Sequence, residues 1–466
     1  MRAPRVALTL AALAAGLAFA WPAAAAGLIQ AWQAASVNDR DWAVANAARA
    51  AAAPRRDQAQ ALWRPTVGLN ASLGVARSDT ATEGAQFSAP GFGSVRGADF
   101  ATSVNAGASE RWAIEARQPL YSPERRARQR QLELGADRAD LEWQAAREQL
   151  MLRTAERYFK LALALEAERV VARQLAAVER AAAEAEDRFR LGDVPVTDTR
   201  EAQARLAELR ARHLAAHADT ESAREDLADS TGLPAAGLQA LLPGNAPVAP
   251  GATLDTWLAE ARSGNPEIRL RELEGEIARV DATRYSRAAA PSVDLVAQAG
   301  REHLSGSGDF GSGAYGATNA MVGIQLSVPL FSGGYREARE REGQRLADAA
   351  SARTESARRQ TEQAVRDAWR GLELGAARVQ ALGAAVAAAE ARLDATRLGR
   401  QVGDRTTLDL LEAENASAAS RLALAQAKVG WVLDRLRLSA LAGRLDEPLL
   451  QVVDRGLEAA PAATHP

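Results

Sequence analysis

An internal duplication limits the fold of this sequence more than any other feature. Three segments recur in the same order: 63–69 at 289–295, 118–122 at 328–332, and 192–202 at 403–413. The spacing is 226 residues for the first pair, 210 for the second and 211 for the third. Collinear matches of this kind predict two copies of one structural unit. The shorter second spacing predicts a longer surface insertion in the first copy.

The hydrophobic pattern changes in the same order within each copy. Apolar residues first alternate with polar ones, as at Val67, Leu69 and Leu73, and this period of two predicts strands with one apolar face. A long stretch without proline then follows in each copy, rich in Ala, Leu, Arg, Glu and Gln. These residues are the strongest helix formers, so we expect a helix of about 100 Å followed by a second helix that returns along it.

These patterns define a set of predicted boundaries. Residues 1–26 are predicted to be a signal peptide, and residues 27–233 to be the first repeat. The first repeat is expected to contain a helix at about 28–62, strands at about 64–77 and 104–120, a long helix at about 124–191 and a returning helix at about 196–230. A proline-rich linker (234–252) is expected to precede the second repeat (253–445), and a C-terminal segment (446–466) to follow it. The second repeat is expected to contain a helix at about 253–287, strands at about 289–301 and 319–331, a long helix at about 335–401 and a returning helix at about 405–441. The stretches 77–103 and 301–319 are rich in Gly, Ser and Asp and are predicted to be loops.

The N-terminal segment predicts export from the cytoplasm. Arg2 and Arg5 precede an apolar run, and an A-x-A cleavage site follows within Ala23–Ala26. This is the pattern of a secretory signal peptide. A membrane anchor is the alternative, but the run is short and Pro22 interrupts it. No later stretch is expected to span a bilayer as a helix, so the exported protein is either soluble or crosses a membrane as strands.

Composition excludes several classes of function. The absence of cysteine excludes disulfides, thiol catalysis, cysteine-bound zinc and a lipid on cysteine. The net charge of −2 lacks the excess of basic residues that is typical of nucleic-acid-binding proteins. Gly306–Gly311 fits G-x-G-x-x-G but precedes a predicted strand, and His213 and His217 lack a third ligand, which favours a solvated face. We therefore expect no catalytic residues, metal site or cofactor, and any energy for transport must come from another protein.

The predicted strands require more than one chain. Strands of 10–15 residues can cross a bilayer, but backbone groups in lipid must all be paired, so the sheet must close. Four strands cannot close on themselves, because known barrels begin at about eight. Tyr121, Phe331 and Tyr335 stand at positions typical of a membrane interface at one end, with Phe100 and Tyr315 towards the other. A soluble sandwich of two hairpins that caps a coiled coil is the alternative.

The duplicated order of elements and two kinds of motif resemble the TolC-type outer-membrane efflux and type I secretion family. The motifs are the strand exits Pro119–Ser122 and Pro329–Ser332, and the turns that run from Leu191 to Asp198 and from Val402 to Asp409. The resemblance implies an α+β membrane protein, a homotrimer whose twelve strands form one outer-membrane β-barrel, continued by a long periplasmic α-helical barrel. The linker would form an equatorial belt around that barrel. The lack of cysteine places the chain with the unlipidated branch.

The resemblance also implies a function. Members of the family act as passive exit ducts of tripartite export systems, with a periplasmic adaptor and an inner-membrane ABC or proton-driven transporter as partners. Type I secretion of a toxin-like protein is the expected task, and multidrug efflux is the alternative. A structural coiled-coil scaffold of the envelope and a periplasmic enzyme are the two other classes, and the second lacks any identifiable site.

The matched positions predict a gate at the periplasmic tip. Asp409 and Glu412 match the acidic positions that ring the narrow entrance, and in a trimer they would place six carboxylates around one axis. Arg405 matches a basic residue that ties this coil to the neighbouring turn, where Thr197 and Asp198 match its partners. Ordinary solvated charge near a helix turn is the alternative for each of them.

One gate position departs from the family pattern. The best-known members carry a tyrosine where this chain has Arg400, which could instead pair with Asp198 or repel Arg405. The resemblance further predicts that the two tip turns dock the adaptor. The residues of these turns are Leu191, Gly192, Asp193, Val402, Gly403 and Asp404.

Overall fold

The structure is a computed structural model that describes residues 27–91, 93–244, 251–287 and 290–457. The predicted signal peptide lies outside the described residues. The chain forms two compact units. We call Ala45–Ala145 with Pro266–Thr361 the strand unit, and the described parts of 1–44, Ala146–Asn265 and 362–466 the helical unit.

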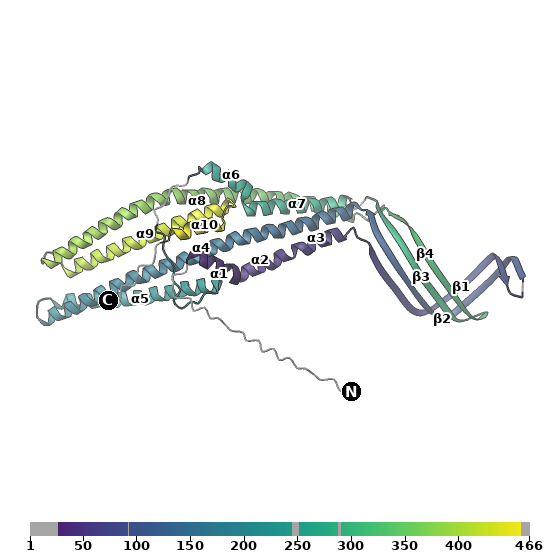
Figure 1. The fold of residues 1–466 in the computed structure, drawn as a ribbon, viewed down its shortest axis with the longest axis horizontal. Helices are drawn as coiled ribbons and strands as arrows, with labels where there is room; N and C mark the ends of the chain where they lie inside the picture. Colours follow the sequence, from purple (N-terminus) through teal and green to yellow (C-terminus); the bar gives the residue numbers. More distant parts are fainter. Residues whose placement is uncertain (1–26, 92, 245–250, 288–289, 458–466) are drawn as a thin grey trace, which may run out of the picture. The chain divides into compact units, whose positions relative to one another are not determined.

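One antiparallel sheet dominates the strand unit. The sheet has four strands in the order β1-β2-β3-β4, so β1 and β4 form its two edges (Figure 1). Their bounds are β1 Thr66–Ala89, β2 Gly93–Tyr121, β3 Ser292–Gly308 and β4 Gly311–Ser327. Helices α2 (Arg40–Ala50), α3 (Ala52–Ala61) and α7 (Pro266–Arg287) precede the two hairpins in the chain.

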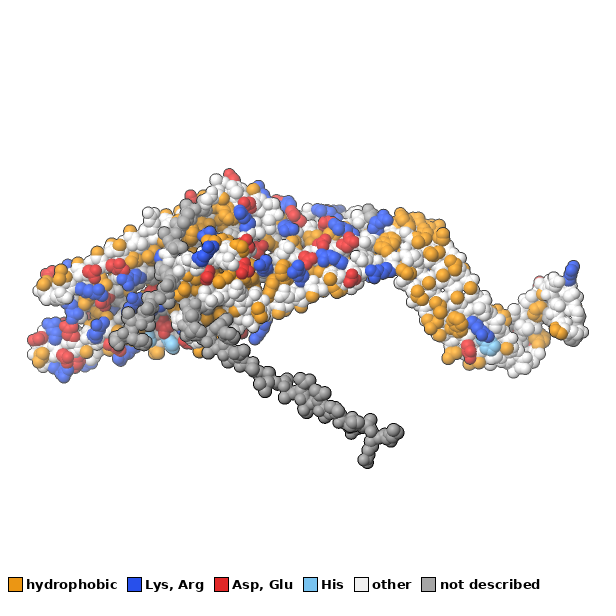
Figure 2. Space-filling view, in the orientation of Figure 1, with side chains coloured by type: hydrophobic (Ala, Val, Ile, Leu, Met, Phe, Trp, Pro, Cys, Tyr) orange, Lys and Arg blue, Asp and Glu red, His pale blue; other side chains and the backbone are white. Residues whose placement is uncertain are grey.

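The two faces of this sheet differ in polarity. Leu69 lies opposite Ile114, and Leu295 lies opposite Ile324, so their side chains share one face. Many apolar residues on this face are exposed, for example Leu73 at 83% and Val322 at 76%. Figure 2 shows this band of hydrophobic side chains over the strands. A contiguous exposed apolar surface of this kind requires cover by lipid or protein.

The opposite face of the sheet is polar and carries ion pairs. The Arg111 guanidinium lies 2.6 Å from Glu302, and Arg117 lies 3.5 Å from Asp294. Strand alternation therefore gives the sheet one apolar face and one hydrated face, as the period of two predicts.

The prediction of loops at 77–103 and 301–319 was wrong. β1 and β2 continue through most of the first stretch, and β3 and β4 meet at a short turn between Gly308 and Gly311. Register shifts between Ala76 and Ser78 and near Ala85 interrupt the longer hairpin. The sequence signal was missing because both faces are polar there, whereas backbone hydrogen bonds do not require apolar side chains. The G-x-G-x-x-G segment therefore lies at a strand turn.

Two long helical hairpins form most of the helical unit. α5 (Val196–Thr231) returns along α4 (Pro123–Arg190), and α9 (Thr407–Leu441) returns along α8 (Tyr335–Gln401) (Figure 1). Ion pairs join the helices within each hairpin, with 3.2 Å between Arg210 and Glu179 and 3.4 Å between Arg397 and Glu414. Shorter helices complete the unit: α1 Leu28–Asn38, α6 Leu254–Gly264 and α10 Glu447–Arg455.

The predicted single helices at 28–62 and 253–287 are each broken. Asp39 and Asn265 have extended backbones at the breaks. Asn265 precedes Pro266, which disfavours helical geometry at that residue. Near each break an asparagine amide donates to the carbonyl that ends a returning helix: Asn38 to Thr231 O at 2.8 Å, and Asn265 to Leu441 O at 2.9 Å. These bonds satisfy carbonyls that the helix ends leave unpaired.

Two buried aromatic residues anchor the helical unit. Tyr158 and Phe159 are fully buried, and their rings meet edge to face with centroids 5.4 Å apart. The Tyr158 hydroxyl accepts a hydrogen bond from Leu241 N at 3.0 Å. The linker is therefore fixed to α4 by a hydrogen bond from its backbone.

The expectation that no later helix is apolar enough to span a bilayer needs correction. By length and composition alone, α8 qualifies among the described helices, with an 18-residue stretch of mean hydropathy 1.2. Only 11% of that stretch is buried within the chain. Its apolar character comes mainly from alanine, whose small side chain suits close packing between helices.

Glu148 on α4 makes stability depend on pH. Burial raises its pKa to about 7, against a usual value of 4.5, while Arg147 acts in the opposite direction. The folded state therefore holds a proton that the unfolded state loses, so stability falls as the pH rises from about 4.5 to 7. We expect Glu148→Gln to stabilise the protein by about 1–3 kcal/mol at pH 8 and by little at pH 4.5. Thermal unfolding at both pH values measures this difference.

The matched control for this prediction is Glu225→Gln. Glu225 is exposed on α5 of the same unit, so its neutralisation should leave the pH dependence unchanged. Equal stabilisation by Glu148→Gln at both pH values would contradict the assignment of the proton to this residue.

Candidate functional site

The far ends of the two hairpins have the same turn geometry. Gly192 and Gly403 have φ values of +80° and +84°, a region that glycine occupies without strain. Asp193 N donates to Arg188 O and Asp404 N donates to Gly399 O, each at 2.9 Å. Both long helices thus end in the left-handed turn that commonly closes a helix. Glycine is required here by local geometry alone.

Each turn presents an apolar side chain to solvent. Leu191 is 78% exposed and Val402 is 75% exposed, and each stands directly before the glycine of its turn. Isolated exposed apolar residues are common, but here two occupy equivalent positions on equivalent turns. The described chain contains no residue that covers either one.

The acidic residue Asp409 has a structural role that the sequence analysis missed. Its carboxylate accepts hydrogen bonds from the backbone N–H and the hydroxyl of Thr406, both at 2.9 Å, and Thr406 Oγ1 accepts from Asp409 N at 3.1 Å. This reciprocal capping box begins α9. The same hydrogen bonds hold the pKa of Asp409 below its usual value. The spacing Thr406-x-x-Asp409 was the available signal.

The corresponding start of α5 is built differently. Pro195 occupies the cap position and provides no side-chain hydrogen bond. Asp198 accepts a hydrogen bond from the Thr197 hydroxyl at 3.2 Å. Asp198 therefore remains exposed and free of the capping function that Asp409 performs.

A cleft of about 740 Å³ lies between the two hairpins near their turns. Its lining includes these predicted site residues: Asp198, Arg400, Gly403, Asp404, Arg405 and Glu412. The other predicted residues lie outside its lining: Leu191, Gly192, Asp193, Thr197, Val402 and Asp409. Further charged residues in the lining were missed: Glu184, Arg188, Glu201 and Arg205. The structure thus brings both hairpins' charges to one cleft.

Arg400 has a partner that neither sequence interpretation named. Its guanidinium forms an ion pair with Glu184 on α4, in place of Asp198. The two residues are 216 positions apart, so no local pattern could have paired them. Glu184 was therefore missed as a site residue.

Arg405 is placed differently from Arg400. Among the described residues it forms no salt bridge, and its tie to Thr197 and Asp198 stays a prediction for a neighbouring turn. Its side-chain stem lies against Gly399, where an added Cβ would come within 2.7 Å of Arg405 Cγ. Its charged end remains exposed beside the cleft.

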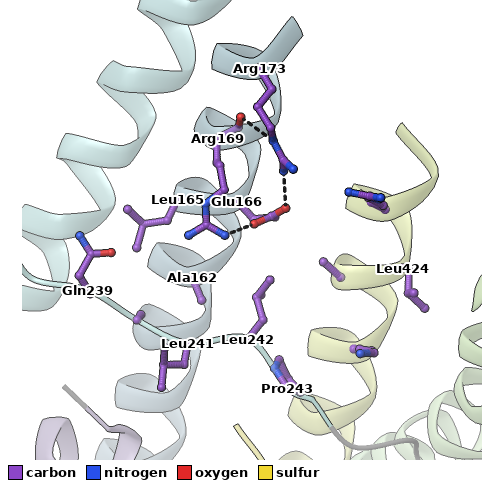
Figure 3. Close-up of a pocket in the computed structure, with 14 residues that line it drawn as sticks. Ala162, Leu165, Glu166, Arg169, Arg173, Gln239, Leu241, Leu242, Pro243 and Leu424 are labelled. Atoms are coloured by element: carbon purple, nitrogen blue, oxygen red, sulfur yellow. Dashed lines mark hydrogen bonds and ion pairs between the residues drawn. The ribbon is translucent and has the colours of Figure 1, made fainter. Parts of the chain in front are cut away.

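A second cavity of the helical unit lies beside the linker and has a volume of about 360 Å³. Glu166 lies between Arg169 at 2.7 Å and Arg173 at 3.4 Å, and Figure 3 shows these three side chains at its wall. Among the described residues no group of three or more His, Cys, Asp or Glu could hold a metal ion. His217 is 56% exposed and pairs with Glu168 at 2.8 Å, so it lies on a solvated helix face, as expected, with one carboxylate partner.

Comparison with known proteins matches most of this chain to a single family. A family model described as outer membrane efflux protein matches residues 31–233 and 257–444. Outer membrane protein TolC of Escherichia coli (strain K12) is 28% identical over 334 residues, which cover 70% of this chain and 68% of that protein. The alkaline protease secretion protein AprF of Pseudomonas aeruginosa is 28% identical over 344 residues, 73% of this chain and 71% of that protein.

Solved structures share the same fold. The CmeC outer membrane channel of Campylobacter jejuni superposes with a TM-score of 0.74 at 16% identity, covering 92% of this chain and 90% of that one. The mixture of long helices and an antiparallel sheet is therefore common to both. The chain belongs to the outer membrane efflux protein family, and it is an outer-membrane protein that extends into the periplasm.

Proposed function

We propose that this protein is the exit duct of a tripartite export system. In this proposal it passively conducts substrate from an inner-membrane transporter and a periplasmic adaptor to the outside of the cell. Membership of the efflux family supports transport, and the names of TolC and AprF support an outer-membrane role in secretion. The single observation that carries the proposal is the sheet of the strand unit, which has two open edges and one exposed apolar face.

The open edges favour assembly from several copies. β1 and β4 are long edge strands, and a lipid-facing sheet must close because unpaired backbone groups in hydrocarbon are costly. We infer that three copies supply twelve strands to one barrel and twelve helical segments to a periplasmic tunnel, as the family resemblance implies. The exposed alanine stretch of α8 supports this inference, because it suits close packing against a neighbouring copy.

The cargo that we favour is a protein. AprF is named for secretion of alkaline protease, and a further relative from Dickeya chrysanthemi is named proteases secretion protein PrtF. Multidrug efflux remains the second candidate, favoured by the efflux names of the family and of BepC from Brucella suis. Deletion of the gene separates them: loss of a secreted protein with unchanged drug susceptibility supports the first, and the reverse supports the second.

Conductance tests the duct itself. We expect the purified protein to form trimers in detergent and to conduct ions in planar lipid bilayers. A scaffold protein would form no channel, and a water-soluble monomer would overturn the proposal. No cofactor takes part in this function, because the duct carries out no reaction.

The entrance is proposed to select for cations through Glu412. This residue lies in the cleft between the hairpins and is exposed, whereas Asp409 also caps α9. Glu412→Gln removes three carboxylates from a trimer without touching the cap. We expect the preference of the channel for cations to fall. We also expect block by a trivalent cation to weaken by about tenfold or more, because each lost attraction between a carboxylate and the cation near a surface is worth about 1 kcal/mol or more. Single-channel recordings measure both.

The comparison variants separate selectivity from helix capping. Asp409→Asn keeps an oxygen for the Thr406 hydrogen bonds and should also reduce cation preference. Asp394→Asn removes an exposed carboxylate of α8 that does not line the cleft, and it should have no effect. Unchanged selectivity in Glu412→Gln would exclude this residue from the constriction.

A further inference from the structure

The first helix of the helical unit begins against a carboxylate from near the other end of the sequence. Asp454 belongs to α10, and its Oδ1 accepts a hydrogen bond from Ile29 N at 3.3 Å. Gly27 occupies the cap position of α1, where it provides no side-chain hydrogen bond, and the first turn of α1 contains no acidic residue. Asp454 therefore supplies the acceptor and the negative charge that the start of α1 lacks.

Gly27 lies in direct contact with this carboxylate. A Cβ added at Gly27 would lie 2.7 Å from Asp454 Oδ1 and 3.2 Å from Oδ2. The nitrogen of Gly27 and the added Cβ are substituents of the same tetrahedral carbon, at nearly equal bond lengths. A rotation of about 120° around the Cα–C bond of Gly27 would therefore carry the nitrogen to the position of that Cβ. There it would lie at the distance of a charge-assisted hydrogen bond from Oδ1.

Asp454 has no cationic partner among the described residues. The neighbouring Arg455 donates instead to the carbonyl of Gln451 at 3.2 Å. Asp454 is half-buried, and its charge reaches the packed centre of the unit: burial raises the pKa of Tyr158, and the negative charge of Asp454 raises it further. A carboxylate in such surroundings is costly unless a cation lies beside it.

The sequence places a cleavage site directly before Gly27. Ala24–Ala26 fits the A-x-A pattern that precedes the cut in a secretory signal peptide. Hydrolysis of the peptide bond between Ala26 and Gly27 consumes one water and releases the carboxylate of Ala26 and the α-amine of Gly27. The amine takes up a proton at neutral pH. The cut thus creates a cation beside Asp454, and it also frees the Gly27 nitrogen to rotate.

The packing of α1 holds Gly27 at this place. Leu28 and Ala31 are fully buried, and α1 packs against α5 and α10. At the other end of α1, the Asn38 amide donates to Thr231 O at 2.8 Å. A terminus on a helix that is fixed at both ends loses little further conformational entropy when it forms an ion pair.

We propose that Asp454 is the receptor for the N-terminus of the processed chain: after cleavage between Ala26 and Gly27, the α-ammonium of Gly27 forms an ion pair with the Asp454 carboxylate. The precursor cannot form this pair, because an amide nitrogen carries no charge. Removal of the signal peptide therefore strengthens the connection between α1 and α10. The inference is independent of the proposed duct function, since it concerns the maturation of the helical unit.

Mass spectrometry of the protein from the outer-membrane fraction tests where the mature chain begins. We expect it to begin at Gly27, because only that terminus places the α-ammonium against Asp454. A chain that begins at Ala25, which a cut after Ala24 would produce, would carry its charge two residues away. That result, or any other starting residue, would overturn the inference.

Acetylation with acetic anhydride at neutral pH tests whether the amine is paired. Asp454→Asn keeps an oxygen for the hydrogen bond from Ile29 N but removes the charge. It should speed acetylation of Gly27 by about three- to tenfold, because a paired ammonium releases its proton less readily. Lys160, which pairs with Asp226 at 2.5 Å, is the internal reference for folding. Its rate should not change.

The matched control is Asp219→Asn, which removes an exposed carboxylate of α5. It should leave the acetylation of Gly27 at the wild-type rate. Equal rates in the wild-type protein and in Asp454→Asn would overturn the inference.

An N-terminal extension separates the ion pair from helix capping. Insertion of Gly-Ser between Ala26 and Gly27 moves the α-ammonium two residues away and leaves Asp454 in place. Asp454→Asn should lower the transition temperature of the normal mature protein by about 1–3 °C and should change that of the extended protein far less. Equal lowering in both proteins would show that Asp454 only caps α1, and it would overturn the inference.

Discussion

Ile324→Arg in the C-terminal part of β4 should prevent assembly of the protein in the outer membrane. Ile324 is 72% exposed on the apolar face of the sheet, where Leu295 lies opposite it. An arginine on a lipid-facing strand costs up to about 2–4 kcal/mol, depending on its depth in the bilayer, and a trimer would bear that cost three times. We expect the proposed trimer to be lost from the outer-membrane fraction in gel electrophoresis.

The adjacent residue supplies a control in the same strand. Gln325 points to the opposite face and lies across from Asp294 on β3. Gln325→Arg should therefore keep the trimer, since the hydrated face already carries Arg111 and Arg117. Loss of the trimer in both variants, or in neither, would contradict the assignment of the apolar face to lipid.

Phe159→Ala should destabilise the helical unit more than any surface change. Phe159 is fully buried and packs edge to face against Tyr158. Truncation of a buried phenylalanine typically costs about 3–5 kcal/mol, because the cavity it leaves is only partly filled. Thermal unfolding followed by circular dichroism in detergent should show a clearly lower transition temperature.

Phe189 provides the matched comparison on the same helix. It is 41% exposed near the end of α4, so Phe189→Ala should change the transition temperature far less. Equal effects of the two substitutions would show that burial within one chain does not determine their contributions.

Helix positions were predictable because their signals are local and strong. The long helices were predicted at 124–191 and 335–401, and α4 and α8 run from Pro123 to Arg190 and from Tyr335 to Gln401. Proline-free sequences rich in helix formers determine such elements with little help from tertiary contacts. The breaks at Asp39 and Asn265 were missed, although Pro266 was a local signal for the second one.

Strand lengths were less predictable than strand positions. Alternation marks a strand only where one face is apolar, and the outer parts of β1 and β2 have small or polar residues on both faces. The candidate site likewise has residues that the local sequence predicts and contacts that it does not predict. Gly192 and Gly403 mark the tip turns by their own backbone preference, whereas the partner of Arg400 depends on how two distant hairpins pack.

The unequal hairpins of the strand unit have a consequence for evolution at the cell surface. Beyond its pairing with β3, which begins at Ala108 and Ser305, much of the β1–β2 hairpin pairs only with itself (Figure 1). In an outer-membrane duct this extension would be the part that antibodies and bacteriophages meet first. Substitutions that evade such encounters would accumulate there without disturbing the periplasmic helices, which neither agent can reach.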